Sequence, residues 1–181
     1  MINSKEELKE YINFELNNYS KSRLKRIVFT HVPFVISESQ ILMKFHIILR
    51  KCEYYVNCNK KIRSYIYKVK LNRYKVKYSL NIPVNTFGKG LKIMHIGPIL
   101  VNHNAKIGEN CSIHINTAIV AGGKNHIAPK IGDNAIIFVG TTILGDVTIG
   151  DNAIIGANSL VNKSFGDNST IVGNPARDVS K

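Results

Sequence analysis

The chain has 181 residues, 44% of them hydrophobic and 20% charged, with a formal net charge of +13, which is the composition of a globular protein with a core of its own. Its longest apolar stretch, ILMKFHIILRK, is broken by Lys44 and His46, so we expect no membrane-spanning helix, and the charged start MINSKEELKEY lacks the pattern of a signal peptide. Three cysteines without a zinc or disulfide spacing are expected to be free thiols.

Charge and aromatic content divide the chain. Residues 1–80 hold 17 Lys and Arg against 6 Asp and Glu, whereas residues 81–181 hold 8 against 6, and all eight tyrosines precede residue 80. We therefore expect two regions: a basic, α-helical N-terminal region over residues 1–79 and a second domain over residues 80–181.

The first region has helical signals. Ser4 with Glu7, and Ser37 with Gln40, have the spacing of capping boxes that precede amphipathic segments. A third segment, KKIRSYIYKVKLNRYKVKY, places Ile62, Tyr65, Ile66 and Val69 on one helical face, although YIYKVK also alternates as a strand does.

The second region repeats every six residues. Aliphatic residues recur at this interval, with Asn125 in the one missing place, and a two-residue slip at VNHN joins them to an upstream series of Phe87, Ile93 and Ile99. The main series is Ile107, Ile113, Ile119, Ile131, Ile137, Ile143, Ile149, Ile155 and Val161.

Compact residues lie two positions before each aliphatic one in the main series, and Gly or another small residue often follows it. Neither a helix nor a hairpin has this period. A chain wound as a triangular prism does, because each short strand forms one side and each aliphatic residue points to the axis. Stacked coils then bury a column that no single repeat buries alone.

The segments PVNTFGKGLKIMH, IGPILVNHNAKIGENCSI and GNPAR resemble the hexapeptide-repeat acyltransferases, and within them the serine acetyltransferase-like branch. The resemblance covers about residues 80–179. It implies a mainly β fold, a left-handed parallel β-helix after a small helical region, in a homotrimer that binds acetyl-CoA between subunits. The helical half, with RKCEYY, and the APKIGDN hexad are similar to enzymes of bacterial surface-polysaccharide clusters.

The resemblance places His95 at the family's catalytic histidine, the general base that takes the proton of the acceptor hydroxyl. By itself, a histidine between aliphatic residues is more often structural. His114 follows about one coil later, displaced by one position, and is a candidate for the acceptor site or for surface packing. His126 is a second acceptor-site candidate, two positions from the place that the family's histidine takes before Pro-Lys-Ile.

Other positions correspond to those that hold acetyl-CoA in the family. A backbone N–H at Ala121 or Gly122 is the candidate oxyanion donor, and Lys163 and Arg177 are candidates for the CoA phosphates. Further backbone contacts to the pantetheine arm are expected at Val139, Gly140, Gly156 and Ala157.

Some positions depart from serine acetyltransferases. Met94 replaces the aspartate before the catalytic histidine, Leu80 or Asn81 stands where that histidine's aspartate partner aligns, and the Arg-His pair is absent. A backbone carbonyl, an Asn or Glu109 remains as a partner for His95. Since a zwitterion needs charged partners, these departures favour a neutral acceptor.

We therefore expect transfer of acetyl from acetyl-CoA to a saccharide hydroxyl of a capsular, O-antigen or exopolysaccharide precursor. The alternatives are a serine O-acetyltransferase of cysteine synthesis and a non-catalytic β-helix scaffold. A metal site built from His95, His114 and His126 is not expected.

The run from Lys44 to Lys77 holds eleven Lys and Arg and one acidic residue. Such a run is typical of a solvated face, and it also suits contact with an anionic membrane or an acidic glycan. Nucleic acid is not expected, because no binding motif accompanies the charge. We expect a cytoplasmic protein, with contact to the inner face of the membrane as one alternative to a solvated face.

Overall fold

The computed structural model describes residues 1–22, 24, 26, 28, 37–122 and 126–180. The chain forms two compact units, residues 1–77 and 78–181, and the boundary expected from composition lies two residues later. Each unit is described by itself.

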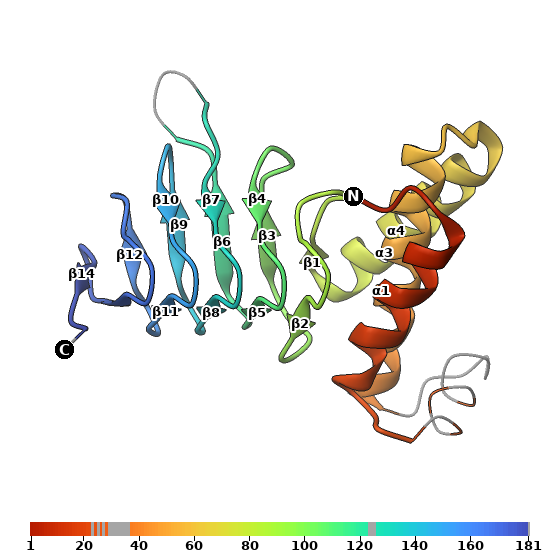
Figure 1. Cartoon of the computed structure of the whole chain (residues 1–181), viewed down its shortest axis with the longest axis horizontal. Coiled ribbons are helices and arrows are strands. Elements are labelled where there is room, and N and C mark those ends of the chain that lie inside the picture. The colour runs from red at the N-terminus through yellow and green to blue at the C-terminus, as the bar shows by residue number, and fades with distance from the viewer. Residues whose placement is uncertain (23, 25, 27, 29–36, 123–125, 181) are drawn as a thin grey trace. The chain divides into compact units, whose positions relative to one another are not determined.

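The first unit contains the helices α1 (Lys5–Asn17), α3 (Glu38–Asn57) and α4 (Lys61–Tyr78) (Figure 1). Ser4 and Glu7 form the predicted capping box at the start of α1. Ser37 caps α3, where its Oγ accepts a hydrogen bond from the Gln40 N–H at 3.3 Å. The third basic segment is a helix and not a strand.

Helices α1 and α3 share a buried ionic cluster. Arg50 donates from Nε to Glu15 Oε1 at 3.0 Å and from Nη1 to Glu53 Oε2 at 2.8 Å, and Nη2 also contacts Glu15. His46 Nδ1 lies 3.0 Å from Glu15 Oε2, and His46 Nε2 lies 2.9 Å from the Tyr19 hydroxyl. Although burial opposes ionisation, the charges of Arg50 and His46 lower the pKa of Glu15 to about 2.

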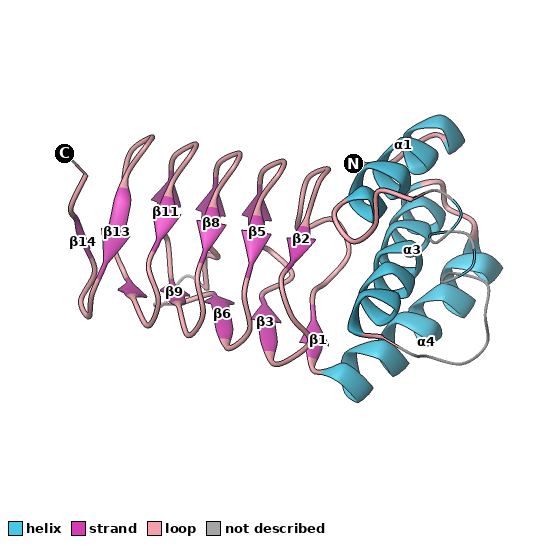
Figure 2. Cartoon of the chain, turned by 90° about the horizontal axis from the view of Figure 1, so that it is seen from below, coloured by secondary structure: helices cyan, strands magenta, loops and turns pink. Residues whose placement is uncertain are grey.

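The second unit is a parallel β-helix of three sheets (Figures 1 and 2). Two sheets are five- and six-stranded. The first contains β1 (Leu80–Asn81), β3 (Ile99–Val101), β6 (Thr117–Val120), β9 (Thr142–Leu144) and β12 (Leu160–Val161). The second contains β2 (Lys92–Ile93), β5 (Ser112–Ile113), β8 (Ile136–Ile137), β11 (Ile154–Ile155), β13 (Thr170–Val172) and β14 (Arg177–Asp178).

The third sheet has three strands, β4 (Lys106–Ile107), β7 (Lys130–Ile131) and β10 (Thr148–Ile149). We name the three sheets by their first strands: the β1 sheet, the β2 sheet and the β4 sheet. The chain visits the β2 sheet, then the β1 sheet, then the β4 sheet in each coil.

The six-residue series forms the axis of the prism, as predicted. Every member of the main series and all three upstream members are buried, none of them more than 5% exposed. Four pairs of parallel strands join residues 18 apart, such as Ile136 with Ile154, whereas the three pairs that span the vacant place, among them Ala118 with Thr142, join residues 24 apart. The coil that contains the vacant place is therefore one hexad longer than an 18-residue coil, and the extra hexad lies between β6 and β7. Asn125 itself lies outside the described residues.

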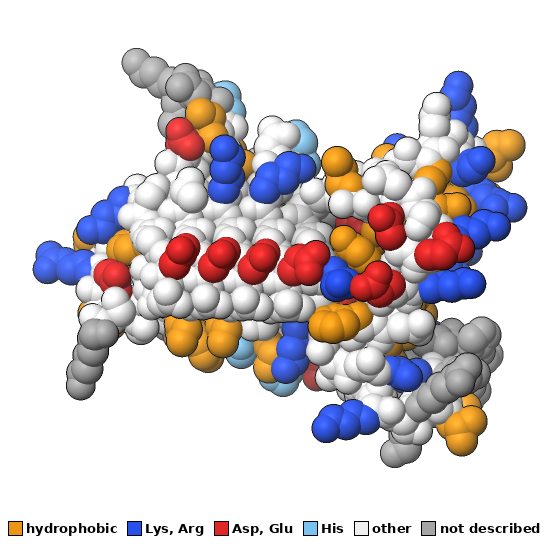
Figure 3. All heavy atoms as spheres, viewed as in Figure 1, with side chains coloured by type: hydrophobic (Ala, Val, Ile, Leu, Met, Phe, Trp, Pro, Cys, Tyr) orange, Lys and Arg blue, Asp and Glu red, His pale blue; other side chains and the backbone are white. Residues whose placement is uncertain are grey.

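One corner of the prism explains the recurring Gly-acidic-Asn triplet. Asp133 Oδ1 accepts a hydrogen bond from the Glu109 N–H at 2.7 Å, and Asp151 Oδ1 accepts one from the Asp133 N–H at 2.7 Å. A Cβ at Gly132 would overlap Asp151 Oδ1, so glycine leaves room for the carboxylate of the next coil. Figure 3 shows the resulting row of acidic side chains.

None of the described helices has the length and hydropathy that a bilayer crossing requires.

Candidate active site

His95 lies at the corner where the chain leaves the β2 sheet. The strand β2 is fixed by Ile93, which is fully buried and pairs with Ile113 in the next coil. His95 follows two residues later and is exposed. The buried strand therefore sets the wall of the prism, and the imidazole is displayed on its outside.

Three residues stack along this corner, one from each successive coil. Met94 N–H donates to Ile113 O at 3.0 Å, His114 N–H donates to Ile137 O at 3.0 Å, and Phe138 N–H donates to Ile155 O at 2.9 Å. The ring of His114 stacks on that of Phe138, with centroids 5.1 Å apart and planes at 25°. His114 therefore stands in the column of Met94, one position from that of His95.

His114 and His95 nevertheless interact. Partial burial lowers the pKa of His114 below its ordinary value, and the charges of His95 and Lys92 lower that pKa further. The corner thus favours a neutral imidazole at His114 and places it within electrostatic reach of His95.

Four acetyl-CoA candidates follow the same corner in later coils. Gly140 N–H donates to Ile115 O at 3.2 Å, and Val139 O accepts from Asn158 N–H at 2.9 Å. Gly156 N–H donates to Ile171 O at 2.8 Å, and exposed Ala157 follows it. The structure therefore brings Val139, Gly140, Gly156 and Ala157 onto the corner that carries His95.

Gly140 has a backbone conformation that favours glycine. Its φ is +75°, a region that side chains disfavour, and an added Cβ would overlap Asn158 Oδ1.

Four of the remaining candidates lie elsewhere in the unit. Ala121, Gly122, His126 and Lys163 belong to the corner between the β1 and β4 sheets and, within one chain, are not at the corner of His95. Arg177 is exposed in β14 and pairs with Val172, which continues the corner of His95 beyond Gly156.

Two of these residues have defined contacts. Gly122 N–H donates to Ile127 O at 3.3 Å, so Ala121 is the remaining candidate for the oxyanion donor. Lys163 Nζ lies 5.4 Å from the ring centroid of Phe165. His126 is exposed and has a φ of +50°.

Glu109, one of the partners considered for His95, precedes the strand whose far end carries His114. It therefore lies at the opposite end of the β2 sheet, in the row of acidic side chains, and is not the partner of His95. Within the described residues, no three His, Cys, Asp or Glu side chains gather as metal ligands.

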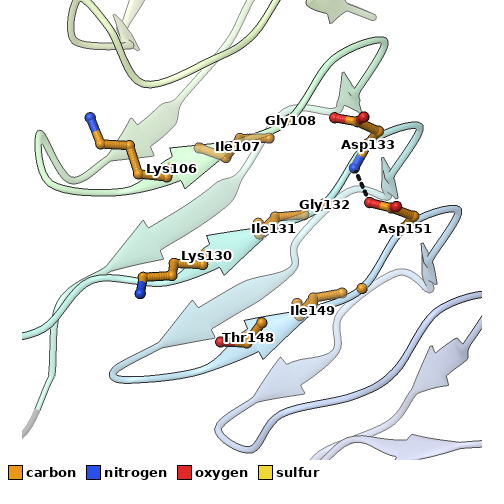
Figure 4. Close-up of a pocket in the computed structure, with 11 residues that line it drawn as sticks. Lys106, Ile107, Gly108, Lys130, Ile131, Gly132, Asp133, Thr148, Ile149 and Asp151 are labelled. Carbon is orange, nitrogen blue, oxygen red and sulfur yellow. Dashed lines mark hydrogen bonds between the residues drawn. The ribbon is translucent and has the colours of Figure 1, made fainter.

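The described hollows lie away from this corner. One runs along the outside of the β4 sheet, where Figure 4 shows Lys106, Lys130 and Thr148 projecting on one side and the Asp133–Asp151 hydrogen bond on the other. Another lies on the β1 sheet beside Leu100 and Asn116. Neither is lined by His95.

Sequence reasoning missed Phe138. Its signal was available, because it follows the axial Ile137 just as His114 follows Ile113. The extra hexad, however, puts 24 residues between them, so the register of the coils had to be known first.

Residues 128–163 match the protein family described as "Bacterial transferase hexapeptide (six repeats)". Serine acetyltransferase 3, mitochondrial, of Arabidopsis thaliana is 40% identical over 97 residues, which are 52% of this chain and 25% of that protein. A putative serine acetyltransferase of Schizosaccharomyces pombe is 36% identical over 107 residues, 58% of this chain and 40% of that protein. The chain thus spans less than half the length of these relatives.

Solved structures of similar fold cover nearly all of the chain. Soybean serine acetyltransferase apoenzyme gives a TM-score of 0.72 at 27% identity, over 95% of this chain and 69% of that one. A serine acetyltransferase in complex with CoA gives 0.72 at 21% identity, over 97% and 71%. The predicted left-handed β-helix with a short helical region before it is confirmed.

The predicted saccharide acceptor is wrong. The relatives and solved structures named above are serine acetyltransferases, and nothing in these matches supports a polysaccharide enzyme. Single departures such as Met94 do not outweigh a similarity that extends over about a hundred residues. The matches likewise lend no support to a peripheral membrane location.

Proposed function

We propose that this chain, which has the left-handed β-helix fold and matches the hexapeptide transferase description over residues 128–163, is an acetyl-CoA-dependent serine O-acetyltransferase. The observation that carries the proposal is the 36–40% identity to serine acetyltransferases over 97–107 residues. One solved neighbour of 27% identity is described as complexed with serine.

His95 acts as the general base. The exposed imidazole takes the proton of the serine hydroxyl while that oxygen attacks the thioester carbonyl of acetyl-CoA. The C–S bond then breaks, acetyl stays on the serine oxygen, and the imidazolium returns its proton to the CoA thiolate. Histidine suits both steps because its ordinary pKa lies near neutrality.

The backbone of the same corner supports acetyl-CoA binding. Val139–Gly140 and Gly156–Ala157 continue the line of His95 through later coils, so a pantetheine arm laid along this corner passes both pairs in turn. Glycine at 140 and 156 lets a ligand approach the backbone closely.

The residues on the other corner fit a trimer. Ala121, His126 and Lys163 lie one sheet away from His95 in their own subunit, and the proposed site lies between two subunits, where that corner of one prism faces His95 of the next. Ala121 N–H then donates to the oxyanion, His126 lies towards the acceptor, and Lys163 and Arg177 meet the CoA phosphates.

The acceptor side has one distinctive feature. Half-buried Met94 precedes His95, so no carboxylate meets the serine ammonium from that position.

We place the reaction in the cytoplasm, since the described cysteines, Cys52, Cys58 and Cys111, are all free thiols, as in a reducing compartment.

The mechanism is tested by His95→Ala. Turnover of acetyl-CoA with L-serine should fall about 10²- to 10⁴-fold, the usual contribution of a general base. Acetyl-CoA binding, measured by calorimetry, should remain within a few-fold, because the groups proposed to hold CoA are intact.

Glu109→Ala is the matched control, because Glu109 lies at the end of the β2 sheet opposite to His95 and belongs to neither corner of the proposed site. It should keep full activity. Equal turnover in the wild type and His95→Ala would contradict the mechanism, and a wild type that binds no acetyl-CoA would identify the chain as a scaffold.

A further inference from the structure

Helix α4 has two faces of different environment. Leu71 is 4% exposed, and Tyr67 packs against Tyr55 with ring centroids 5.1 Å apart, so this side of the helix is in contact with the rest of the helical unit. Ile62 lies nine residues before Leu71, which is two and a half turns and therefore the opposite side of the helix.

The opposite side is apolar and exposed. At about 100° per residue, five apolar side chains fall within an arc of roughly 100° that is centred opposite Leu71. They are between 38% and 80% exposed, and we call them the outer stripe of α4: Ile62, Tyr65, Ile66, Val69 and Val76. Arg73 is the cation within this arc.

Cations flank the outer stripe on both sides. Lys61 and Lys68 border one edge of the stripe, and Arg63, Lys70 and Lys77 border the other, while α4 contains no acidic residue. An apolar stripe between two rows of Lys and Arg supplies the two components that a helix uses in the interface of an anionic bilayer, apolar side chains for the acyl boundary and cations for the headgroups.

We propose that α4 docks on an anionic lipid surface, with the outer stripe buried among the acyl chains and the flanking Lys and Arg against the headgroups. This proposal concerns location and is independent of the proposed acetyl transfer.

The positive charge of α4 favours an anionic bilayer over a second copy of the helix or a nucleic acid. A second copy of α4 against the stripe would bring two sets of Lys and Arg together, and like charges repel. A nucleic acid would use the cations and leave five apolar side chains exposed, because phosphate contacts come from Lys and Arg. A bilayer with anionic headgroups satisfies both components.

The chain has no tryptophan, so a single substitution supplies a local probe. Tyr65→Trp places indole on the outer stripe, and Tyr67→Trp places it on the packed side. With vesicles of phosphatidylglycerol and phosphatidylcholine, emission of Tyr65→Trp should shift to the blue and be quenched by brominated acyl chains. Emission of Tyr67→Trp should change little.

Binding is measured by flotation of the full chain with the same vesicles. The double substitution Ile62→Ser with Val76→Ser should weaken binding by about tenfold or more, since interfacial affinity scales with the apolar area inserted. Both side chains are more than 70% exposed, so folding should be kept. Val179→Ser, at an exposed apolar site of the other unit, is the matched control.

Several results would overturn the proposal. They are equal binding to neutral and anionic vesicles, equal spectral behaviour of the two Trp variants, and binding that survives Ile62→Ser with Val76→Ser. A lower oligomer mass of that double variant without lipid would assign the stripe to a second copy of the chain. Preference for duplex DNA over vesicles would assign it to nucleic acid.

Discussion

Met94 and His95 are neighbours in the chain, yet the fold gives them different surroundings. Met94 stands in a column above His114 and Phe138, half-buried, while His95 projects from the same turn and is exposed. The proposed base is thus held by a turn whose preceding residue is apolar. Because that residue is apolar, position 94 offers no carboxylate to the ammonium group of the proposed acceptor.

Met94→Asp should lower the KM for L-serine. A carboxylate beside the proposed base would meet the ammonium of serine with a charge-assisted hydrogen bond of roughly 1.5–3 kcal/mol, which corresponds to a tenfold or larger change. Steady-state kinetics at saturating acetyl-CoA measures it. Met94→Asn, of similar size and uncharged, is the control, and an equal KM in the two variants would show that the charge is not what matters.

The sequence predicts the axis better than it predicts the corner. Ile93 and Ile113 follow from the period of six together with the two-residue slip at VNHN, because each side of the prism must send one aliphatic residue inward. Stacking of His114 on Phe138 depends on the register across the extra hexad, where residues 24 apart become neighbours. The six-residue period alone does not say which coil of one strand faces which coil of the next across this extra hexad.

At the scale of elements, the β-helix is built from strands of only two to four residues. Such strands hold few hydrogen bonds each, so the corners contribute as well. Asp133, Asp151 and Asp167 each accept a hydrogen bond from a backbone N–H of the preceding coil, at 2.7–2.8 Å. The carboxylates also form a row of like charges, and their mutual repulsion opposes the stabilisation that these hydrogen bonds give.

Two substitutions of Asp151 distinguish the hydrogen bond from the charge repulsion. Asp151→Ala removes the acceptor for the Asp133 N–H and should lower the free energy of unfolding by about 1 kcal/mol. Asp151→Asn keeps an acceptor oxygen and removes one charge, so its stability should equal or exceed that of the wild type at low salt. Urea denaturation at two salt concentrations measures both, and equal losses in the two variants would contradict a capping role.

At the scale of the whole molecule, the two units are stabilised differently. The β-helix buries a column of aliphatic residues, whereas the helical unit contains a buried ionic cluster. Capping residues and period predicted the helices, and the ambiguous third segment became a helix because Leu71 and Tyr67 pack on one side. The cluster was not predicted, since Glu15 and Arg50 are 35 residues apart.

Acid should act on the helical unit through Glu15. Its pKa is about 2 in the fold and near 4.5 when unfolded, so the carboxylate stabilises the fold above pH 4.5 and loses that contribution as the pH falls towards 2. The loss is roughly 3 kcal/mol at 1.36 kcal/mol per pKa unit. Helical circular dichroism against urea at several pH values measures it.

Glu15→Gln provides the comparison. It should be less stable than the wild type at pH 7, because Arg50 loses a charged partner in a buried place, and its stability should depend less on pH between 4.5 and 2. The same dependence in both proteins would contradict the assignment.

The central claim is acetyl transfer to serine, and the most direct measurement is the product. The full chain is incubated with acetyl-CoA and L-serine, CoA release is followed by thiol titration, and the acetylated product is identified by mass spectrometry. The account predicts O-acetyl-L-serine in equal amount to the CoA released, with turnover on the order of 1–10³ s⁻¹. Binding of acetyl-CoA without any serine-dependent release of CoA would contradict it.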